Sequence, residues 1–287
     1  MGLYKRYSGK NKWKGKVRNV ILAVVLCLLA AVVLFPIFYM IVSSFGEPVE
    51  SGGGSYSIIP KSISLRSYKF FFEFSPYSFR WILNSLIVAG TVTLSNVIFS
   101  TLAGYAFAKI RFPGCQVFFF LLLTAMMVPY QVTQVPLYML FVNNLHMQDT
   151  YVALIAPTLV NCYNVFLAKQ FISSVPSALI EAAKIDGCSQ PALVFRIVVP
   201  MSKTVLAVIA ITTFLGEWNT FFWPFLITNS EAMQTIQVGL KNFSYANTTY
   251  FAPMMAGATV SALPMFILFF ALQKYFLEGV TVGAVKG

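Results

Sequence analysis

Six long and nearly uninterrupted apolar runs constrain this chain more than any other feature of its sequence. Each can cross a bilayer as a helix, which takes about 20 predominantly apolar residues. Only 10% of the residues are charged, against about 25% in soluble domains. Because the runs are continuous rather than alternating, we expect helices and not a β-barrel. The sequence predicts an all-α polytopic membrane protein with spans at 20–45, 81–110, 117–142, 151–171, 197–227 and 251–276.

The second, third and fifth runs are longer than a straight crossing requires, so we expect them to tilt, kink or extend past the bilayer. Proline removes a backbone hydrogen bond from a helix. Pro129, Pro136 and Pro200 are therefore the predicted kink points.

The basic residues of the chain predict its orientation. Residues 1–19 are rich in Lys and Arg and contain no acid, and positive flanks stay on the cytoplasmic side. With six spans both termini are then cytoplasmic. The excess of basic residues on the cytoplasmic side accounts for the net charge of +11, which therefore does not indicate nucleic-acid binding. The expected parts are a basic N-terminus at 1–19, a membrane domain at 20–276 with a cytoplasmic loop at about 174–200, and a cytoplasmic tail at 277–287.

Residues typical of catalysis or cofactor binding are absent from the sequence. It has no P-loop motif for a nucleotide, and its four cysteines lie scattered, without zinc-ligand spacing. The single histidine, His146, is expected to be a solvated loop residue. Glu217 is the one carboxylate expected inside a span, so proton-coupled transport by this chain alone is poorly supported. We expect neither an enzyme nor a bound cofactor.

Two predicted outer loops leave alternatives open. The first, at about 46–80, opens with a flexible glycine run at 51–55 and then carries a phenylalanine cluster at 70–74. That cluster fits either an interfacial aromatic belt or a docking surface for an external partner. The third outer loop, at about 228–250, is polar and can reach outward or fold back.

The cytoplasmic loop between the fourth and fifth runs predicts a short helix at 177–185. Pro176 suits a first helical position. Leu179, Ala182 and Ala183 form a narrow apolar stripe, with Glu181 and Lys184 on the other side. The small alanines favour close approach to another protein over an ordinary interfacial helix.

A tight turn is expected to follow this helix. Gly187 fits the left-handed stop, and Ser189 can cap a second helix. That second helix, at 192–198, is expected to lead into the fifth span.

These residues resemble a known family of membrane proteins. Glu181-Ala182-Ala183, Asp186-Gly187 and Pro200 resemble the EAA loop of the permease subunits of bacterial ATP-binding-cassette (ABC) importers. The rest of the chain, from about residue 21, is similar to the carbohydrate branch and to the second membrane subunit of the maltose permease. The matching segments are Asn84-Ser85, residues 103–108, Met127-Val128-Pro129, residues 135–138, Trp218-Asn219 and residues 283–287.

The resemblance implies a type I importer permease fold in the bacterial inner membrane. It implies pairing with a second, different permease subunit, two ATPase subunits beneath that bind ATP and Mg²⁺, and a solute-binding protein outside. The EAA helix would dock on an ATPase and act as a lever. The residues implied in this coupling are Glu181, Ala182, Ala183, Asp186 and Gly187, with a second contact from Lys286 and Gly287.

The substrate path is predicted from polar and aromatic residues within the spans, because such polar groups face a cavity or the bundle interior. Helix packing, an interfacial belt or helix–helix hydrogen bonds explain the same residues. The predicted path residues are Tyr130, Gln131, Gln134, Asn161, Tyr163, Asn164, Trp218, Asn219, Phe222 and Trp223.

The leading functional hypothesis is an importer permease for a sugar or oligosaccharide. An importer permease for another solute, such as a polyol, glycerol phosphate or an amino acid, is the first alternative. A carrier or channel that works alone, or a membrane scaffold, is less favoured, because neither needs an ATPase-docking helix.

Overall fold

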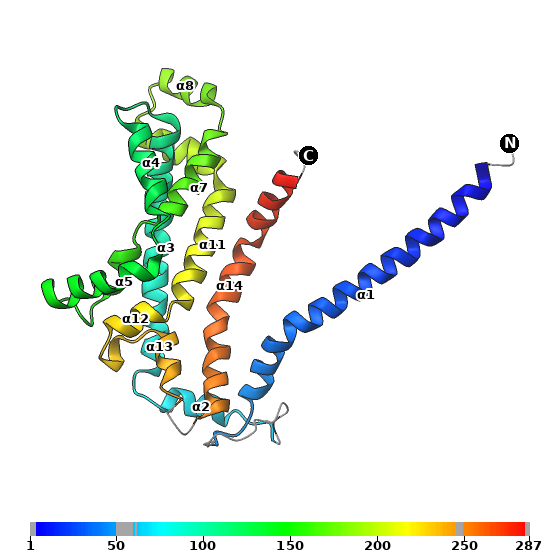
Figure 1. Ribbon diagram of the computed structural model, residues 1–287, viewed down its shortest axis with the longest axis vertical. Coiled ribbons are helices and arrows are strands. Elements are labelled where there is room, and N and C mark those ends of the chain that lie inside the picture. Colours follow the sequence, from blue (N-terminus) through cyan, green and yellow to red (C-terminus); the bar gives the residue numbers. More distant parts are fainter. Residues whose placement is uncertain (1–3, 50–59, 61, 245–248, 285–287) are drawn as a thin grey trace. The chain divides into compact units, whose positions relative to one another are not determined.

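The computed structural model describes residues 4–49, 60, 62–244 and 249–284 (Figure 1). Its elements there are helices, apart from one isolated bridge between Ser244 and Thr249, which confirms the all-α prediction. The predicted contact residues Lys286 and Gly287, and the glycine run, lie outside the described residues.

Two compact units make up the chain. One comprises Met1–Phe71 with Phe243–Thr259, and the other Phe72–Asn242 with Val260–Gly287. In the first unit α1 (Tyr4–Ser44) contains the candidate membrane span Gly15–Ser44, whose most apolar window has no buried residue.

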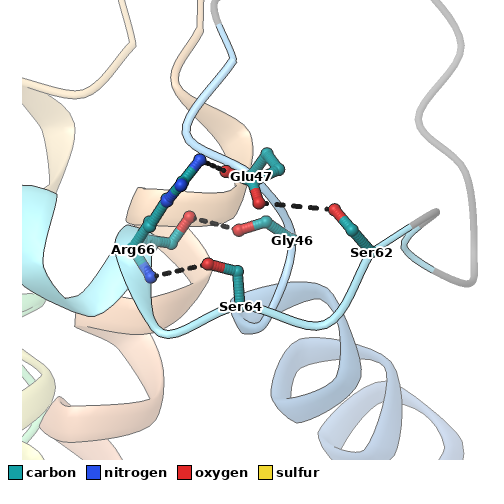
Figure 2. A network of polar contacts seen from close by, with 6 residues as sticks. Gly46, Glu47, Ser62, Ser64 and Arg66 are labelled. Carbon is teal, nitrogen blue, oxygen red and sulfur yellow. Dashed lines mark hydrogen bonds and ion pairs between the residues drawn. The ribbon is translucent and has the colours of Figure 1, made fainter.

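Hydrogen bonds hold the segment that follows α1 against the start of α2 (Arg66–Glu73). The Ser67 hydroxyl donates to the Gly46 carbonyl at 2.6 Å, and the Arg66 guanidinium lies 3.5 Å from the Glu47 carboxylate (Figure 2). Ser62 donates to the same carboxylate at 3.4 Å. The predicted first outer loop is thus ordered around Glu47 where the structure describes it.

Phe70, Phe71 and Phe72 of the phenylalanine cluster lie in α2, and they differ in how far they are buried. Phe71 is fully buried and stacks on Phe243, with ring centroids 5.6 Å apart, while Phe70 lies 5.0 Å from the Tyr250 ring. Phe72 is 43% exposed. Packing inside this unit therefore accounts for part of the cluster.

The second unit is built around α3 (Ser78–Lys109), which lies beside α7 and α11 (Figure 1). Its remaining helices are α4 (Cys115–Ala125), α5 (Tyr130–Met139), η1 (Leu140–Asn144), α6 (Tyr151–Ile155), η2 (Ala156–Thr158), α7 (Cys162–Ser173), α8 (Ser177–Ile185), α9 (Gln190–Leu193), η3 (Val194–Val198), α10 (Val199–Met201), α11 (Lys203–Asn219), α12 (Phe222–Ile227), η4 (Glu231–Met233) and α13 (Ile236–Lys241). The helix α14 (Phe251–Ala284) contributes to both units.

Within the part of the chain that the structure describes, three helices are long and apolar enough to cross a membrane, namely Gly15–Ser44, Ser78–Lys109 and Phe251–Lys274. Three bent pairs of helices bring the number to six if each pair forms one span. The bends are 93° between α4 and the α5–η1 segment, 44° between the α6–η2 segment and α7, and 83° between Gln190–Met201 and α11.

The predicted kinks near Pro129 and Pro200 are confirmed. Pro129 is the extended residue before α5, and the chain bends at Ser202, directly after the short helix that contains Pro200. Pro136 lies inside α5 without ending it. The break before α7 was not predicted, although Pro157 lies next to it.

The predicted continuous span at 197–227 is wrong at its far end. The helix α11 ends at Asn219, Thr220 is extended, and α12 begins at Phe222. Pro224 explains the difference, because it has no N–H to donate to the Thr220 carbonyl. In the first turn of a separate helix that missing donor costs nothing.

Close packing joins α3 to α7. A Cβ on Gly104 would lie 2.7 Å from the Ala168 Cβ and 2.8 Å from the Lys169 nitrogen, so only glycine lets the two helices approach this far. Buried side chains continue the contact on both sides, including Tyr105 and Ile172.

A buried asparagine on α3 satisfies the backbone at the break before α7. The Asn96 amide donates to the carbonyls of Thr158 at 2.8 Å and Leu159 at 3.3 Å, and its oxygen accepts from the Asn161 N–H at 2.9 Å. Ser95 donates to the Leu159 carbonyl at 2.8 Å. Since backbone polar groups at membrane depth need partners, these side chains make the break possible.

We predict that Gly104→Ala destabilises the protein, because the added methyl group forces α3 and α7 apart. The expected loss is about 1–3 kcal/mol, seen as a lower Tm of the detergent-solubilised protein. Gly90→Ala is the matched control on the same helix, since nothing lies within 4 Å of its Cβ position. Equal Tm changes in the two variants would contradict the packing assignment.

We also predict that Asn96→Ala destabilises the break before α7, because the Thr158 carbonyl and the Asn161 N–H lose their partner. An unsatisfied buried group costs about 1–3 kcal/mol, so the Tm should fall and amide exchange at 158–165 should accelerate. The exposed Asn219→Ala is the control. Unchanged exchange in the Asn96 variant would show that another group satisfies the break.

Candidate functional site

The predicted loop helix is present as α8, with the bounds Ser177–Ile185. It lies at one end of the second unit, and α12 and α13 lie at the other (Figure 1). Pro176 is the residue before the helix rather than its first residue. Its fixed φ and extended ψ of 126° direct the chain into the helix from outside.

The turn after α8 has the hydrogen bonds of a Schellman motif. Gly187 has a φ of +82°, which confirms the predicted left-handed stop. The Cys188 N–H donates to the Ala183 carbonyl at 3.0 Å, and the Gly187 N–H donates to the Lys184 carbonyl at 3.1 Å. Ser189 then caps α9 through the Ala192 N–H at 3.4 Å, as predicted.

One face of α8 is buried against the chain itself. The predicted apolar stripe is wrong in composition, because the buried positions are Ile180 and Ala183, at 4% and 8% exposure. They pack in a core cluster that contains Leu193 and Val198. Ala183 therefore packs the helix against the core and is not part of its exposed surface.

The opposite face of α8 is exposed and partly apolar. Glu181 and Ala182 are exposed there, Lys184 is exposed beside Ile180, and Asp186 and Gly187 are exposed in the turn. Leu179 is 46% exposed and Ile185 is 87% exposed. With Ala182 these two side chains make the exposed side of α8 partly apolar.

Polar contacts tie this loop to the end of α3. The Lys109 ammonium donates to the Val175 carbonyl at 2.6 Å and to the Ser173 carbonyl at 3.3 Å, so it satisfies the C-terminus of α7. The Tyr105 hydroxyl donates to the Gln190 side chain at 3.0 Å. These contacts join the segments on both sides of α8 to α3.

A polar cavity of about 170 Å³ lies at the break before α7. It combines side chains from α3, α7 and α11 with the broken backbone. Asn164 donates to the Asn96 oxygen and to the Thr213 hydroxyl, both at 3.0 Å. The lining residues are Asn96, Thr158, Asn161, Tyr163, Asn164, Thr212, Thr213, Gly216 and Glu217.

The structure brings only part of the predicted substrate path to this cavity. Asn161, Tyr163 and Asn164 line it, and Glu217 joins them. Asn161 accepts the Tyr163 N–H at 2.8 Å, so it also caps α7. The predicted path did not include four further lining residues, Asn96, Thr158, Thr212 and Thr213. A polar residue inside an apolar run is the sequence signal that could have found them.

The remaining predicted path residues lie outside the cavity lining. Two buried tryptophans have structural partners: Trp218 donates to the Ser261 carbonyl and Trp223 to the Ala153 carbonyl, both at 3.0 Å. Gln134 is buried on α5. The exposed members of the set are Tyr130, Gln131, Asn219 and Phe222.

At the other end of α3 the segment at 228–242 folds back on the helix, which decides between the two predicted alternatives. Trp81 donates to the Glu231 carbonyl at 2.8 Å, and Asn84 donates to the Gln234 carbonyl at 2.8 Å. The Asp149 carboxylate accepts the N–H groups of Asn229 and Ser230. One helix thus connects this folded segment, the polar cavity and α8.

Comparisons with known proteins agree with this architecture. Residues 96–282 match the family described as binding-protein-dependent transport system inner membrane component. The arabinooligosaccharides transport system permease protein AraQ of Bacillus subtilis (strain 168) is 34% identical, over 94% of this chain and 97% of the relative. The sn-glycerol-3-phosphate transport system permease protein UgpE of Escherichia coli O1:K1 / APEC is 30% identical, over 87% and 91%.

A solved structure has the same fold. A chain of a bacterial ABC transporter involved in the import of the acidic polysaccharide alginate superposes with a TM-score of 0.78 at 22% identity, over 92% of this chain and 98% of that chain. The fold is therefore that of an ABC importer permease, as expected from the resemblance. The chain belongs to the family of binding-protein-dependent transport system inner membrane components.

Proposed function

We propose that this chain is a transmembrane subunit of an ATP-driven importer that carries a sugar or oligosaccharide delivered by an external binding protein. The observation that carries the proposal is the two-sided construction of α8. Its inner face is locked to the core and to α3, while its outer face presents Ile185, Ala182 and Glu181.

In this proposal two separate ATPase subunits supply the energy, and α8 sits in a groove on one of them. A second permease subunit completes the path, and it covers apolar surface that this chain leaves exposed, such as that of α4 and α5. Both termini are cytoplasmic, as the basic N-terminus indicates. The permease itself binds no ATP and performs no catalysis.

In this proposal α3 transmits movement between α8 on the ATPase side and the segment at 228–242 on the binding-protein side. Closure of the ATPases displaces α8, and Lys109 and Tyr105 pass that displacement to α3. The other end of α3 holds the segment at 228–242 through Trp81 and Asn84, on the side where the binding protein docks. Such coupling requires contacts that differ between two states of the transporter.

A saccharide is the favoured solute because arabinooligosaccharides are named for the relative at 34% identity and because the cavity walls are rich in amide and hydroxyl groups.

Uptake of labelled arabinotriose into proteoliposomes tests this proposal. The complex contains the chain with a second permease subunit, ATPase subunits and a solute-binding protein. ATP-dependent accumulation is expected. Failure to accumulate it, with uptake of glycerol 3-phosphate instead, would favour the second solute class.

We predict that Gly187→Val uncouples ATP hydrolysis from uptake. A β-branched residue at a φ of +82° costs about 1–2 kcal/mol, and the turn that presents α8 is distorted although no side chain is nearby. Uptake per ATP hydrolysed should fall while membrane insertion is retained. Gly187→Asn is the matched control, because asparagine tolerates this conformation. Normal uptake in the valine variant would contradict the role of the turn.

We further predict that Ile185→Asp weakens association with the ATPase subunits. A carboxylate at an interface position that the native chain fills with an apolar side chain should cost about 2 kcal/mol or more of binding free energy, roughly thirtyfold in affinity. Co-purification of tagged permease with the ATPase measures the loss. Ile185→Leu keeps the apolar surface and should co-purify normally. Full ATPase recovery with the aspartate variant would place the docking surface elsewhere.

A further inference from the structure

The cavity before α7 contains a feature that transport of neutral sugars does not by itself require, the carboxylate of Glu217. Glutamate is costly within a membrane span and usually marks a pathway or a relay. Among the residues that line this cavity there is no lysine, arginine or histidine. The carboxylate therefore has no counter-charge in this lining.

The broken helix supplies a partial compensation. The N-terminus of α7 opens into the cavity at Asn161 and Tyr163, and a helix N-terminus carries about half a positive charge. The Asn161 side chain already accepts one of its free N–H groups. A net negative potential therefore remains when Glu217 is ionised.

The other polar groups of the cavity are directed by hydrogen bonds. The Asn96 oxygen accepts from Asn161 and Asn164, and its amide is used by carbonyls of the break. The Thr212 hydroxyl donates to the Val208 carbonyl at 2.8 Å. The Glu217 carboxylate and the hydroxyl lone pairs of the threonines remain as acceptors in the cavity, and the Tyr163 hydroxyl in the lining can donate or accept.

We propose that this cavity is a subsite of the translocation path that accepts the hydroxyl groups of an uncharged saccharide and repels anionic solutes, with Glu217 as the selecting residue. The proposal rests on the proposed transport function and refines its substrate class. Arabinooligosaccharides, named for one relative, are uncharged, whereas glycerol 3-phosphate and alginate, named for others, are anionic. The cavity favours the first class.

Thiol labelling tests the charge preference without knowledge of the solute. A cysteine is placed by Thr212→Cys in the full importer complex after the native cysteines are replaced. Two membrane-impermeant methanethiosulfonates are compared at pH 8.5, one bearing trimethylammonium and one bearing sulfonate, each normalised to its rate with a free thiol. Nucleotide-free and ATP-bound complexes are both measured.

We expect the cationic reagent to be preferred at Thr212→Cys, and the preference to fall about tenfold when Glu217→Gln is added, from the Coulomb interaction of one charge at close range. The matched control is Asn143→Cys, exposed in η1 and outside the cavity, where Glu217→Gln should leave the ratio unchanged. Arabinotriose should slow labelling of Thr212→Cys and not of the control.

Two results would overturn the subsite. One is an unchanged reagent ratio in Glu217→Gln, which assigns Glu217 a structural role only. The other is absence of labelling at Thr212→Cys in both nucleotide states, which removes the cavity from the water-filled path. Neither result depends on ATP-driven uptake, so a failure of the proposed transport function is seen separately in the uptake assay.

Discussion

The need to satisfy backbone polar groups inside a membrane governs the second unit of this protein. Three of its predicted spans are bent pairs of helices, and each break exposes carbonyl and N–H groups that lipid cannot satisfy. At the break before α7, Asn96 and Ser95 of the unbroken α3 provide the missing partners. A polar cavity can exist there because those groups are held in place by a rigid neighbour.

The same straight helix links the parts that a coupled transporter must move together. At one end Lys109 and Tyr105 hold the loop that carries α8, near the same end Gly104 brings α7 into close contact, and at the other end Trp81 and Asn84 hold the segment at 228–242. A rigid element with anchored ends transmits displacement better than a chain of flexible contacts. The helix α3 therefore connects the loop that carries α8 physically to the segment at 228–242.

The sequence predicted those features that depend on local chemistry. The limits of α8, the left-handed Gly187 and the Ser189 cap follow from short-range backbone rules, and the helical spans follow from continuous hydrophobicity. It failed where tertiary packing decides: Ala183 faces the core because Leu193 and Val198 return beneath it. The cavity was only partly predicted, since nothing in the sequence shows that Asn96 and Thr213 meet Asn164.

If an ATPase subunit covers the exposed face of α8, a cysteine at position 185 should be protected from thiol reagents in the assembled transporter. Ile185→Cys in a chain without native cysteines is treated with an impermeant maleimide, first in the permease pair alone and then in the complex with its ATPases. We expect rapid labelling of the pair and strong protection in the complex, with Asn143→Cys equally reactive in both. Equal labelling at position 185 in both preparations would contradict it.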